Sequence, residues 1–507
     1  MRGFEGLCVL AMLGFALGGA WAQDSPADAP PQGDARQEPE PAYGQDNPPL
    51  PISENPPLSG LDEPGLEPHA AALSYLQAGA TLGQSADSNA TNALGGQSVV
   101  SISRALGSVT LQRLWHNYDL GLDYMGGAGY YNVTGQGFKA LQQMDLEQKI
   151  AWKRGQLAVR DSFSYLPEGN FGAPYGALGS QGIESLGSSP FGALFGGAAL
   201  GTLGLVPRML NVSLANISEN LTPKSAVTAT GGYAFTHFYG NQVSGAPFIG
   251  SSLVSAQGAY DRILTPHTQV ALAYAYQGFD FSVVGAAFHS HIVEAMYGHR
   301  ISGRMDFVAG AGPQFTHIGL ACTLVDLLEG NTHCSLGPSG PVGTVPDFRI
   351  GVAGQAKLRY RLPKTSLELS YQRFLTSGSG FFLGAQSDIV RLSAERQLSR
   401  VWNGFTDIGY SRNSRLQPLN GQQQKTCGGK NQPPCPGADA NTYTYGFIGG
   451  GLGRAIGHDF HAYMSYQFNE LAFDHSYCGG VTVCSRIGNR QVATFGLDWT
   501  PRPIRID

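Results

Sequence analysis

The stretch Phe348–Leu362, FRIGVAGQAKLRYRL, decides the fold. Its apolar residues recur at every second position, at Phe348, Ile350, Val352, Ala356, Leu358, Tyr360 and Leu362. Its polar residues fall between them, at Arg349, Gln355, Lys357, Arg359 and Arg361. Because successive side chains of a β-strand point to opposite faces, this period of two predicts a strand with one apolar and one polar face.

The length of this stretch indicates the kind of strand. At about 3.3 Å per residue, 15 residues reach roughly 50 Å. Tilted by about 40°, such a strand still crosses an apolar layer about 25 Å thick. A strand of an ordinary globular protein has only about 5–6 residues. The stretch therefore predicts a wall strand of a transmembrane β-barrel.

The composition fits a barrel better than a bundle of membrane helices. Of the 507 residues, 14% are charged and 70 are glycine. The mean hydropathy is only −0.12, and no run of about 20 apolar residues follows the N-terminus, so transmembrane helices are not predicted. A barrel wall alternates apolar with polar residues, and modest hydropathy is typical of it.

The first 70 residues are predicted to lie outside the barrel. Residues 1–22 look like a secretory signal peptide, with an apolar core over Leu7–Ala20 and a small-x-small cleavage site at Ala20–Ala22. Residues 23–70 are rich in proline and hold ten acidic residues against Arg36 alone. Such a composition does not form a core, so we predict a disordered linker. It is either a spacer or a tether to a periplasmic partner.

Residues 71–507 repeat the alternating pattern. We predict about eighteen antiparallel strands, the first beginning at Leu73 and the last ending at Trp499. Even-numbered strands end in tight turns such as Pro363-Lys364, and odd-numbered strands in longer, variable connections. Short turns at one end and long loops at the other are the layout of outer-membrane barrels.

This layout resembles the bacterial outer-membrane β-barrel superfamily, in particular porin-like channels, over residues 73–499. The resemblance implies an all-β, up-and-down barrel inserted in the outer membrane after export to the periplasm. It also implies contact with outer-membrane lipid and with the barrel assembly machinery. The superfamily usually closes with a strand that ends in an aromatic residue, as Trp499 does here, although this chain continues through Pro501 and Pro503 to Asp507.

Six cysteines remain after the signal peptide and form three close pairs in the sequence. They are Cys322 and Cys334, Cys427 and Cys435, and Cys478 and Cys484. All lie in predicted long connections, and an even number in an exported chain predicts disulfides. A metal site is the alternative, but no histidine stands at ligand spacing from them.

The alternation assigns a set of polar residues to the inner face, and we predict that they line a pore. They are Arg349, Gln355, Lys357, Arg359, Arg361, Glu368, Arg391, Glu395, Glu147 and Lys149. Two interpretations are open, a closed network of ion pairs and a wet pore wall. Barrels of 16–18 strands leave an aqueous channel, which favours the second. The basic residues of one strand predict a mild preference for anions.

A long connection, Leu166–Val206, is unusually apolar and is predicted to constrict or plug the lumen. Phe171, Phe191 and Phe195 stand in it among many glycines, with only two acidic residues. Long loops without secondary structure tend to be functional or disordered. Packing over the rim, or against another subunit, is the alternative.

No residues form a recognisable catalytic or metal constellation. His289 and His291 share a face but lack a third ligand. His458, His461, Asp474 and His475 fall around one predicted hairpin without an orienting arrangement. There is no phosphate loop, dinucleotide fingerprint or nucleic-acid patch. We therefore predict neither enzyme activity nor a cofactor.

The sequence favours an outer-membrane channel for passive diffusion of small polar solutes or ions. Two alternatives stay open: an export pore for a polymer such as a polysaccharide, and a non-conducting adhesin or structural barrel. The transported solute and the oligomeric state are not determined by the sequence.

Overall fold

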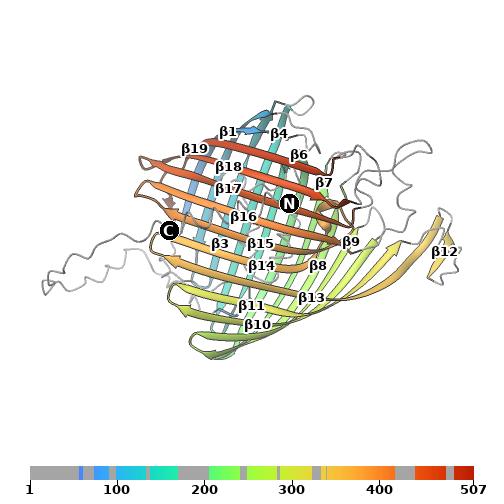
Figure 1. Cartoon of the computed structure of the whole chain (residues 1–507). Coiled ribbons are helices and arrows are strands. Elements are labelled where there is room, and N and C mark those ends of the chain that lie inside the picture. Colours follow the sequence, from blue (N-terminus) through green and yellow to red (C-terminus); the bar gives the residue numbers. More distant parts are fainter. Residues whose placement is uncertain are drawn as a thin grey trace, which may run out of the picture. The chain divides into compact units, whose positions relative to one another are not determined.

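The alternating runs pair into one antiparallel sheet that closes on itself (Figure 1). The computed structural model describes residues 56–60, 74–90, 99–132, 137–168, 205–239, 248–281, 286–321, 333–337, 340–416, 440–475 and 485–506. Of the twenty strands in these residues, β12 and β20 are additions of four and two residues. The remaining eighteen form the wall, as predicted.

Each wall strand pairs with its neighbours along the chain. In the first half they are β1 (Tyr75–Asp87), β2 (Val100–Leu114), β3 (Tyr118–Tyr131), β4 (Gly137–Trp152), β5 (Gly155–Glu168), β6 (Leu205–Thr222), β7 (Ser225–Phe238), β8 (Ser251–Thr265) and β9 (Thr268–Phe281). The second half comprises β10 (Ala286–Ser302), β11 (Met305–Ala321), β13 (Gly340–Leu362), β14 (Thr365–Thr376), β15 (Ala385–Gln397), β16 (Trp402–Arg415), β17 (Thr442–Ile456), β18 (Phe460–Phe473) and β19 (Ile487–Trp499).

Most predicted strand bounds agree with the structure to within a few residues, but β13 does not. It has 23 residues and begins at Gly340, eight positions before the predicted start at Phe348. Its added part pairs with the end of β11 and with β12 (Cys334–Gly337), so β13 and β12 continue beyond the wall as a hairpin (Figure 1). The glycines and prolines of Gly340–Asp347 read as a loop in the sequence, because proline cannot donate a ladder hydrogen bond.

The two ends of the barrel differ in their connections. Short connections 115–117, 153–154, 223–224, 266–267, 303–304, 363–364, 398–401 and 457–459 gather at one end, here called the short-turn end. The opposite, long-loop end holds the remaining connections. Outer-membrane barrels place their short turns in the periplasm and their longer loops outside the cell.

The outer face of the wall is apolar. On β13, the exposed fractions of Ile350 and Val352 are 70% and 56%, whereas Ala353, on the opposite face, is buried. Leu82, Leu272 and Phe495 are more than half exposed on other strands. A continuous row of exposed apolar side chains around a closed sheet is the surface that lipid covers. Among the described residues, no helix is long and apolar enough to span a membrane.

Closure joins the first wall strand to the last. β1 and β19 pair from Ala80↔Trp499 to Asp87↔Val492. After Pro501 and Pro503, the two residues of β20 (Ile504–Arg505) continue beside the start of β1. The residues beyond Trp499, which depart from the usual ending, therefore extend the seam between the first and last strands.

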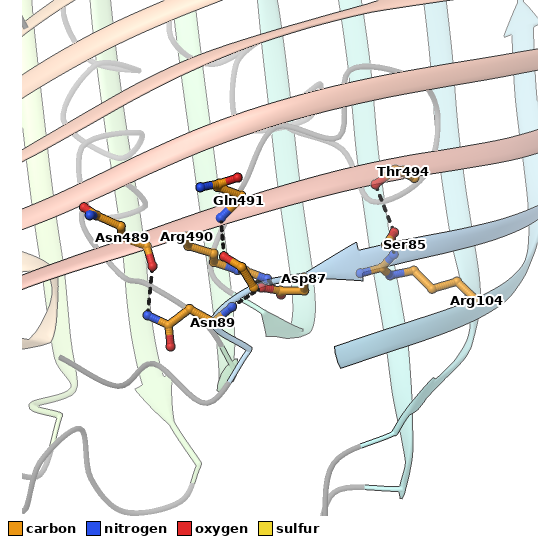
Figure 2. A network of polar contacts seen from close by, with 9 residues as sticks. Ser85, Asp87, Asn89, Arg104, Asn489, Arg490, Gln491 and Thr494 are labelled. Atoms are coloured by element: carbon orange, nitrogen blue, oxygen red, sulfur yellow. Dashed lines mark hydrogen bonds and ion pairs between the residues drawn. The ribbon is translucent and has the colours of Figure 1, made fainter. Parts of the chain in front are cut away.

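A buried ion pair fastens this seam at the long-loop end (Figure 2). Arg490 Nε donates hydrogen bonds to both oxygens of Asp87, at 3.0 and 2.9 Å, and a second guanidinium nitrogen also contacts the carboxylate. The backbone N–H of Asn89 donates to the same carboxylate at 2.9 Å. Both charged side chains are fully buried, so each depends on the other for its solvation.

We expect Asp87→Ala to destabilise the barrel by about 3–5 kcal/mol, because it leaves the Arg490 charge buried without its carboxylate. The exposed pair Arg349–Asp347 provides a control, and Asp347→Ala should cost no more than about 1 kcal/mol. The temperature at which each variant loses its heat-modifiable migration on a denaturing gel measures the difference. Equal midpoints for the two variants would contradict a structural role for the seam pair.

Candidate functional site

The inner face of the wall carries charged side chains that pair across neighbouring strands. Arg359 on β13 donates from Nε to Asp306 Oδ1 on β11 at 2.9 Å, and a second nitrogen contacts Oδ2. Lys357 lies 3.1 Å from Glu368 on β14. Arg391 on β15 forms a bidentate pair with Asp407 on β16, at 2.9 and 2.6 Å. Such charge-assisted pairs hold the side chains in fixed positions along the wall.

The other residues predicted to line a pore have contacts within one strand as well as between strands. Lys149 Nζ and Arg160 Nε reach Glu147 at 2.7 and 2.6 Å. The amide nitrogen of Gln355 donates to Glu294 Oε1 at 3.1 Å. The remaining three are Arg349, paired with Asp347, Arg361 near the end of β13, and Glu395 near the short-turn end of β15.

These positions alternate with the exposed apolar belt, but their role as pore lining stays a prediction. Both interpretations left open by the sequence describe part of this wall. The paired charges form a network, and the basic residues of β13 are accompanied by carboxylates from β11 and β14. A preference for anions that rests on those basic residues is weakened accordingly, because the neighbouring negative charges offset them.

The connection between β14 and β15, at the long-loop end, reaches across the lumen. Ser377–Gly384 joins β14 to β15, and its turn η2 (Gly378–Gly380) carries positive φ angles of 77° and 81° at the two glycines. Gly384 has a φ of 82°, a conformation that L side chains rarely adopt. The carbonyl of Gly380 accepts a hydrogen bond from Ile249 N, which precedes β8, at 3.1 Å. The connection therefore contacts the residues before β8, a strand that lies five wall positions from β14.

Two phenylalanines of this connection fill the space between opposite walls. The Phe381 ring lies 5.3 Å from Phe248, before β8, and 5.5 and 5.3 Å from Tyr443 on β17 and Phe473 on β18, between ring centroids. Phe382 lies 5.2 Å from Tyr443. We call this set the aromatic bridge: Phe248, Phe381, Phe382, Tyr443 and Phe473.

A second apolar cluster lies at the same end of the barrel, and Leu383 and Ile249 pack against it. Its buried residues come from the long-loop ends of β6 to β15 and include Leu210, Leu253, Phe279, Phe288, Ile318, Phe374 and Ile389. The inner face from β6 to β15 therefore carries an apolar cluster at its long-loop end. Apolar constrictions of this kind limit the passage of water and ions.

Four features together define the architecture. The sheet is closed, its outer face is apolar, its inner face is polar, and short turns and long loops lie at opposite ends. The fold is that of a transmembrane β-barrel with the layout of outer-membrane barrels.

Comparison with solved structures finds matches of low similarity over most of the chain. Pseudomonas aeruginosa OccK2 (OpdF) matches at a TM-score of 0.39 and 9% identity, over 84% of this chain and 98% of its own. Pseudomonas aeruginosa OprD matches at 0.38 and 9%, over 86% and 98%, and Acinetobacter baumannii OccAB1 at 0.37 and 10%, over 84% and 96%. No protein-family model and no curated protein sequence matches the chain. At these TM-scores the likenesses do not assign a function.

Arg208 is a buried charged residue of the inner face that the sequence interpretation missed. It lies on β6 at the long-loop end, is only 2% exposed, and interacts electrostatically with Tyr445 on β17. Its Nε and one terminal nitrogen find no hydrogen-bond acceptor in the described part of the chain. Arg208 stands two residues before Leu210 and four before Val212, so the three side chains share the inner face. As one isolated arginine, it forms no charged pattern that the sequence would reveal.

Other predicted residues lie elsewhere. Phe171, Phe191 and Phe195 fall outside the described residues, as do all the paired cysteines except Cys334, whose backbone begins β12. The predicted constriction by 166–206 and the predicted disulfides therefore stay predictions. The aromatic bridge was not predicted from the sequence, although the glycine-flanked Phe381-Phe382 pair is visible in it.

The histidines of the barrel are occupied by structural contacts. His289 and His291 are on the outer face, joined to the hydroxyls of Tyr276 and Tyr274 at 2.8 and 2.7 Å. Asp474 accepts backbone hydrogen bonds from Asn441 and Thr442, at 2.9 and 2.7 Å. Since His461 and Asp474 lie at opposite ends of β18, they do not form one site. No group of three His, Cys, Asp or Glu residues suited to a metal occurs among the described residues.

The charge pairs predict how the lumen selects ions. We expect Lys357→Gln with Arg359→Gln to shift the reversal potential in a salt gradient towards cation selectivity, because Glu368 and Asp306 then lack their cations. The matched variant, Glu368→Gln with Asp306→Asn, should shift it towards anions. Shifts in the same direction in both variants would show that these pairs do not face the permeating ions.

The aromatic bridge predicts a second electrical effect. Replacing Phe381 and Phe382 by alanine should raise the single-channel conductance, since both rings fill the lumen between opposite walls. Phe348→Ala serves as the control, because Phe348 is an aromatic residue exposed on the outer face of β13. Equal conductance of the bridge variant and the control would exclude the bridge as the constriction.

Proposed function

We propose that this protein is an outer-membrane channel through which small polar solutes or ions diffuse passively, without catalysis. The observation that carries the proposal is the polar inner face of an eighteen-strand wall. A barrel of this size has more interior than wall side chains alone fill, and it leaves an aqueous channel. Polar side chains on that face let water-soluble molecules pass a layer of lipid.

The chemistry of the lumen supports uncharged polar or zwitterionic solutes as well as ions. A cavity of about 40 Å³ places four amides, one carboxylate and one guanidinium beside apolar side chains such as Ile292 and Phe374; the polar residues are Gln257, Gln277, Gln355, Gln372, Glu294 and Arg373. The side-chain carbonyl oxygens of Gln277 and Gln314 have no hydrogen-bond partner within the described residues. Buried polar atoms of this kind favour water or a solute that donates hydrogen bonds.

The aromatic bridge favours small solutes over an exported polymer. The aromatic bridge crosses the lumen at the long-loop end, from Phe248 before β8 to Phe473 on the opposite strand β18. A polymer could cross only if this bridge moved aside and stayed displaced until the whole polymer had passed. A non-conducting adhesin or structural barrel would also have polar side chains on its inner face, so conductance is the property that separates it from a channel.

Purified protein in a planar lipid bilayer tests the proposal. We expect stepwise, ohmic currents that persist at constant voltage, and swelling of protein-containing liposomes in isotonic solutions of small sugars or amino acids. Heat-modifiable migration of the same sample confirms that the barrel is folded. A folded barrel that carries no current and lets no small solute through would overturn the channel and leave the adhesin or structural alternative.

A further inference from the structure

Five residues of the predicted disordered linker lie inside the barrel. In Pro56–Gly60, the backbone N–H of Ser59 donates to Asp261 Oδ1 on β8 at 3.2 Å, and its hydroxyl contacts the other carboxylate oxygen. The same hydroxyl lies 2.5 Å from the hydroxyl oxygen of Thr228 on β7. In return, the Gln257 amide donates to the Ser59 carbonyl at 3.3 Å. Three inner-face residues thus bind one serine.

The neighbouring residue, Leu58, fills a hollow in the same wall. It packs against three alanines and a methionine of β8, β9 and β10, namely Ala259, Ala271, Ala273 and Met296. A Cβ atom at Gly298 on β10 would lie 2.6 Å from Leu58 Cδ2, so the missing side chain provides room for the leucine. Small residues on three adjacent strands therefore match the shape of this one side chain.

The docked segment satisfies the polar groups that it buries. Asp261 is 4% exposed, Thr228 1% and Ser59 2%. A buried carboxylate is costly unless it accepts hydrogen bonds, and Ser59 donates two of them to Asp261. A turn closed by the hydrogen bond from Gly60 N to the Pro57 carbonyl, at 3.0 Å, presents the leucine and the serine together.

We infer that the short-turn half of the lumen is a binding site for a leucine–serine turn, that the chain's own Pro56–Gly60 occupies it, and that this docked segment narrows the channel. Thr228, Asp261 and Met296 lie near the short connections 223–224, 266–267 and 303–304, which places the site towards the periplasm. The narrowing rests on the proposed channel function, whereas the docking does not. The domain boundaries predicted for the linker stay a prediction.

Disulfide trapping tests the docking without any measurement of current. In Ser59→Cys/Thr228→Cys, mild oxidation of outer membranes should link the two new cysteines, because the two native hydroxyl oxygens are 2.5 Å apart. Mass spectrometry of the linked peptides distinguishes this bond from those of the native cysteines. Ser59→Cys/Thr494→Cys is the control, since Thr494 lies on β19, far around the wall. No linkage at position 228, or equal linkage at both positions, would overturn the docking.

Leu58→Asp tests whether the docked segment narrows the channel. Placed against three alanines, an aspartate should expel the segment. The yield of the disulfide between Ser59→Cys and Thr228→Cys should then fall about tenfold or more, the factor that corresponds to the free energy of burying a leucine side chain. The change lies outside the wall, and heat-modifiable migration checks that the barrel still forms. Single-channel conductance should rise with the expulsion.

Two outcomes separate the inference from the channel itself. A lost disulfide at unchanged conductance would overturn the narrowing. No current from either the parent or the Leu58→Asp protein would overturn the proposed channel, and with it the narrowing, while the disulfide yield would still decide whether the site is occupied.

Discussion

Every backbone N–H and C=O group inside a bilayer needs a partner from the protein, because hydrocarbon offers none. This barrel meets that requirement only because β1 pairs with β19. The register of this pair also determines which side chains face lipid, since a slip of one residue would reverse both faces. The fully buried Asp87–Arg490 pair lies on this seam, where it is correctly formed in one register only. The faces of the wall, and everything built on them, depend on that closure.

The inner face follows from the same constraint. Once the apolar side chains of a strand face lipid, its polar side chains must face inward, and their charges must be accommodated there. In this barrel neighbouring strands provide opposite charges at matching heights, as Asp306 does for Arg359. The result is a polar wall with little uncompensated charge along β13 to β16. Such a wall is suited to polar solutes of either sign more than to one class of ion.

The wall was predictable because its signal is local. A period of two can be read strand by strand, and Tyr118–Tyr131, Ser225–Phe238 and Thr365–Thr376 have the predicted bounds. The charge pairs were not predictable, because the partner of a charged residue depends on the register between strands. Arg359 and Asp306, for example, are 53 residues apart in the sequence. The start of β13 escaped prediction because Pro341 and Pro346 argue against a strand wherever the pairing partners are unknown. Arg208 and the aromatic bridge depend on contacts across the lumen, for which a sequence holds no periodic signal.

The segments that restrict the lumen are those that leave the alternating pattern. Regular strands produce a tube of nearly constant polarity, and they cannot place a side chain at its centre, because each side chain stands on the wall. Ser377–Gly384 can reach across because three glycines with positive φ angles turn its backbone inward. Pro56–Gly60 reaches the opposite half because it precedes the first strand and is not held by the ladder. In the proposed channel, the eighteen strands therefore provide the tube, and these two irregular segments set the width of its two halves.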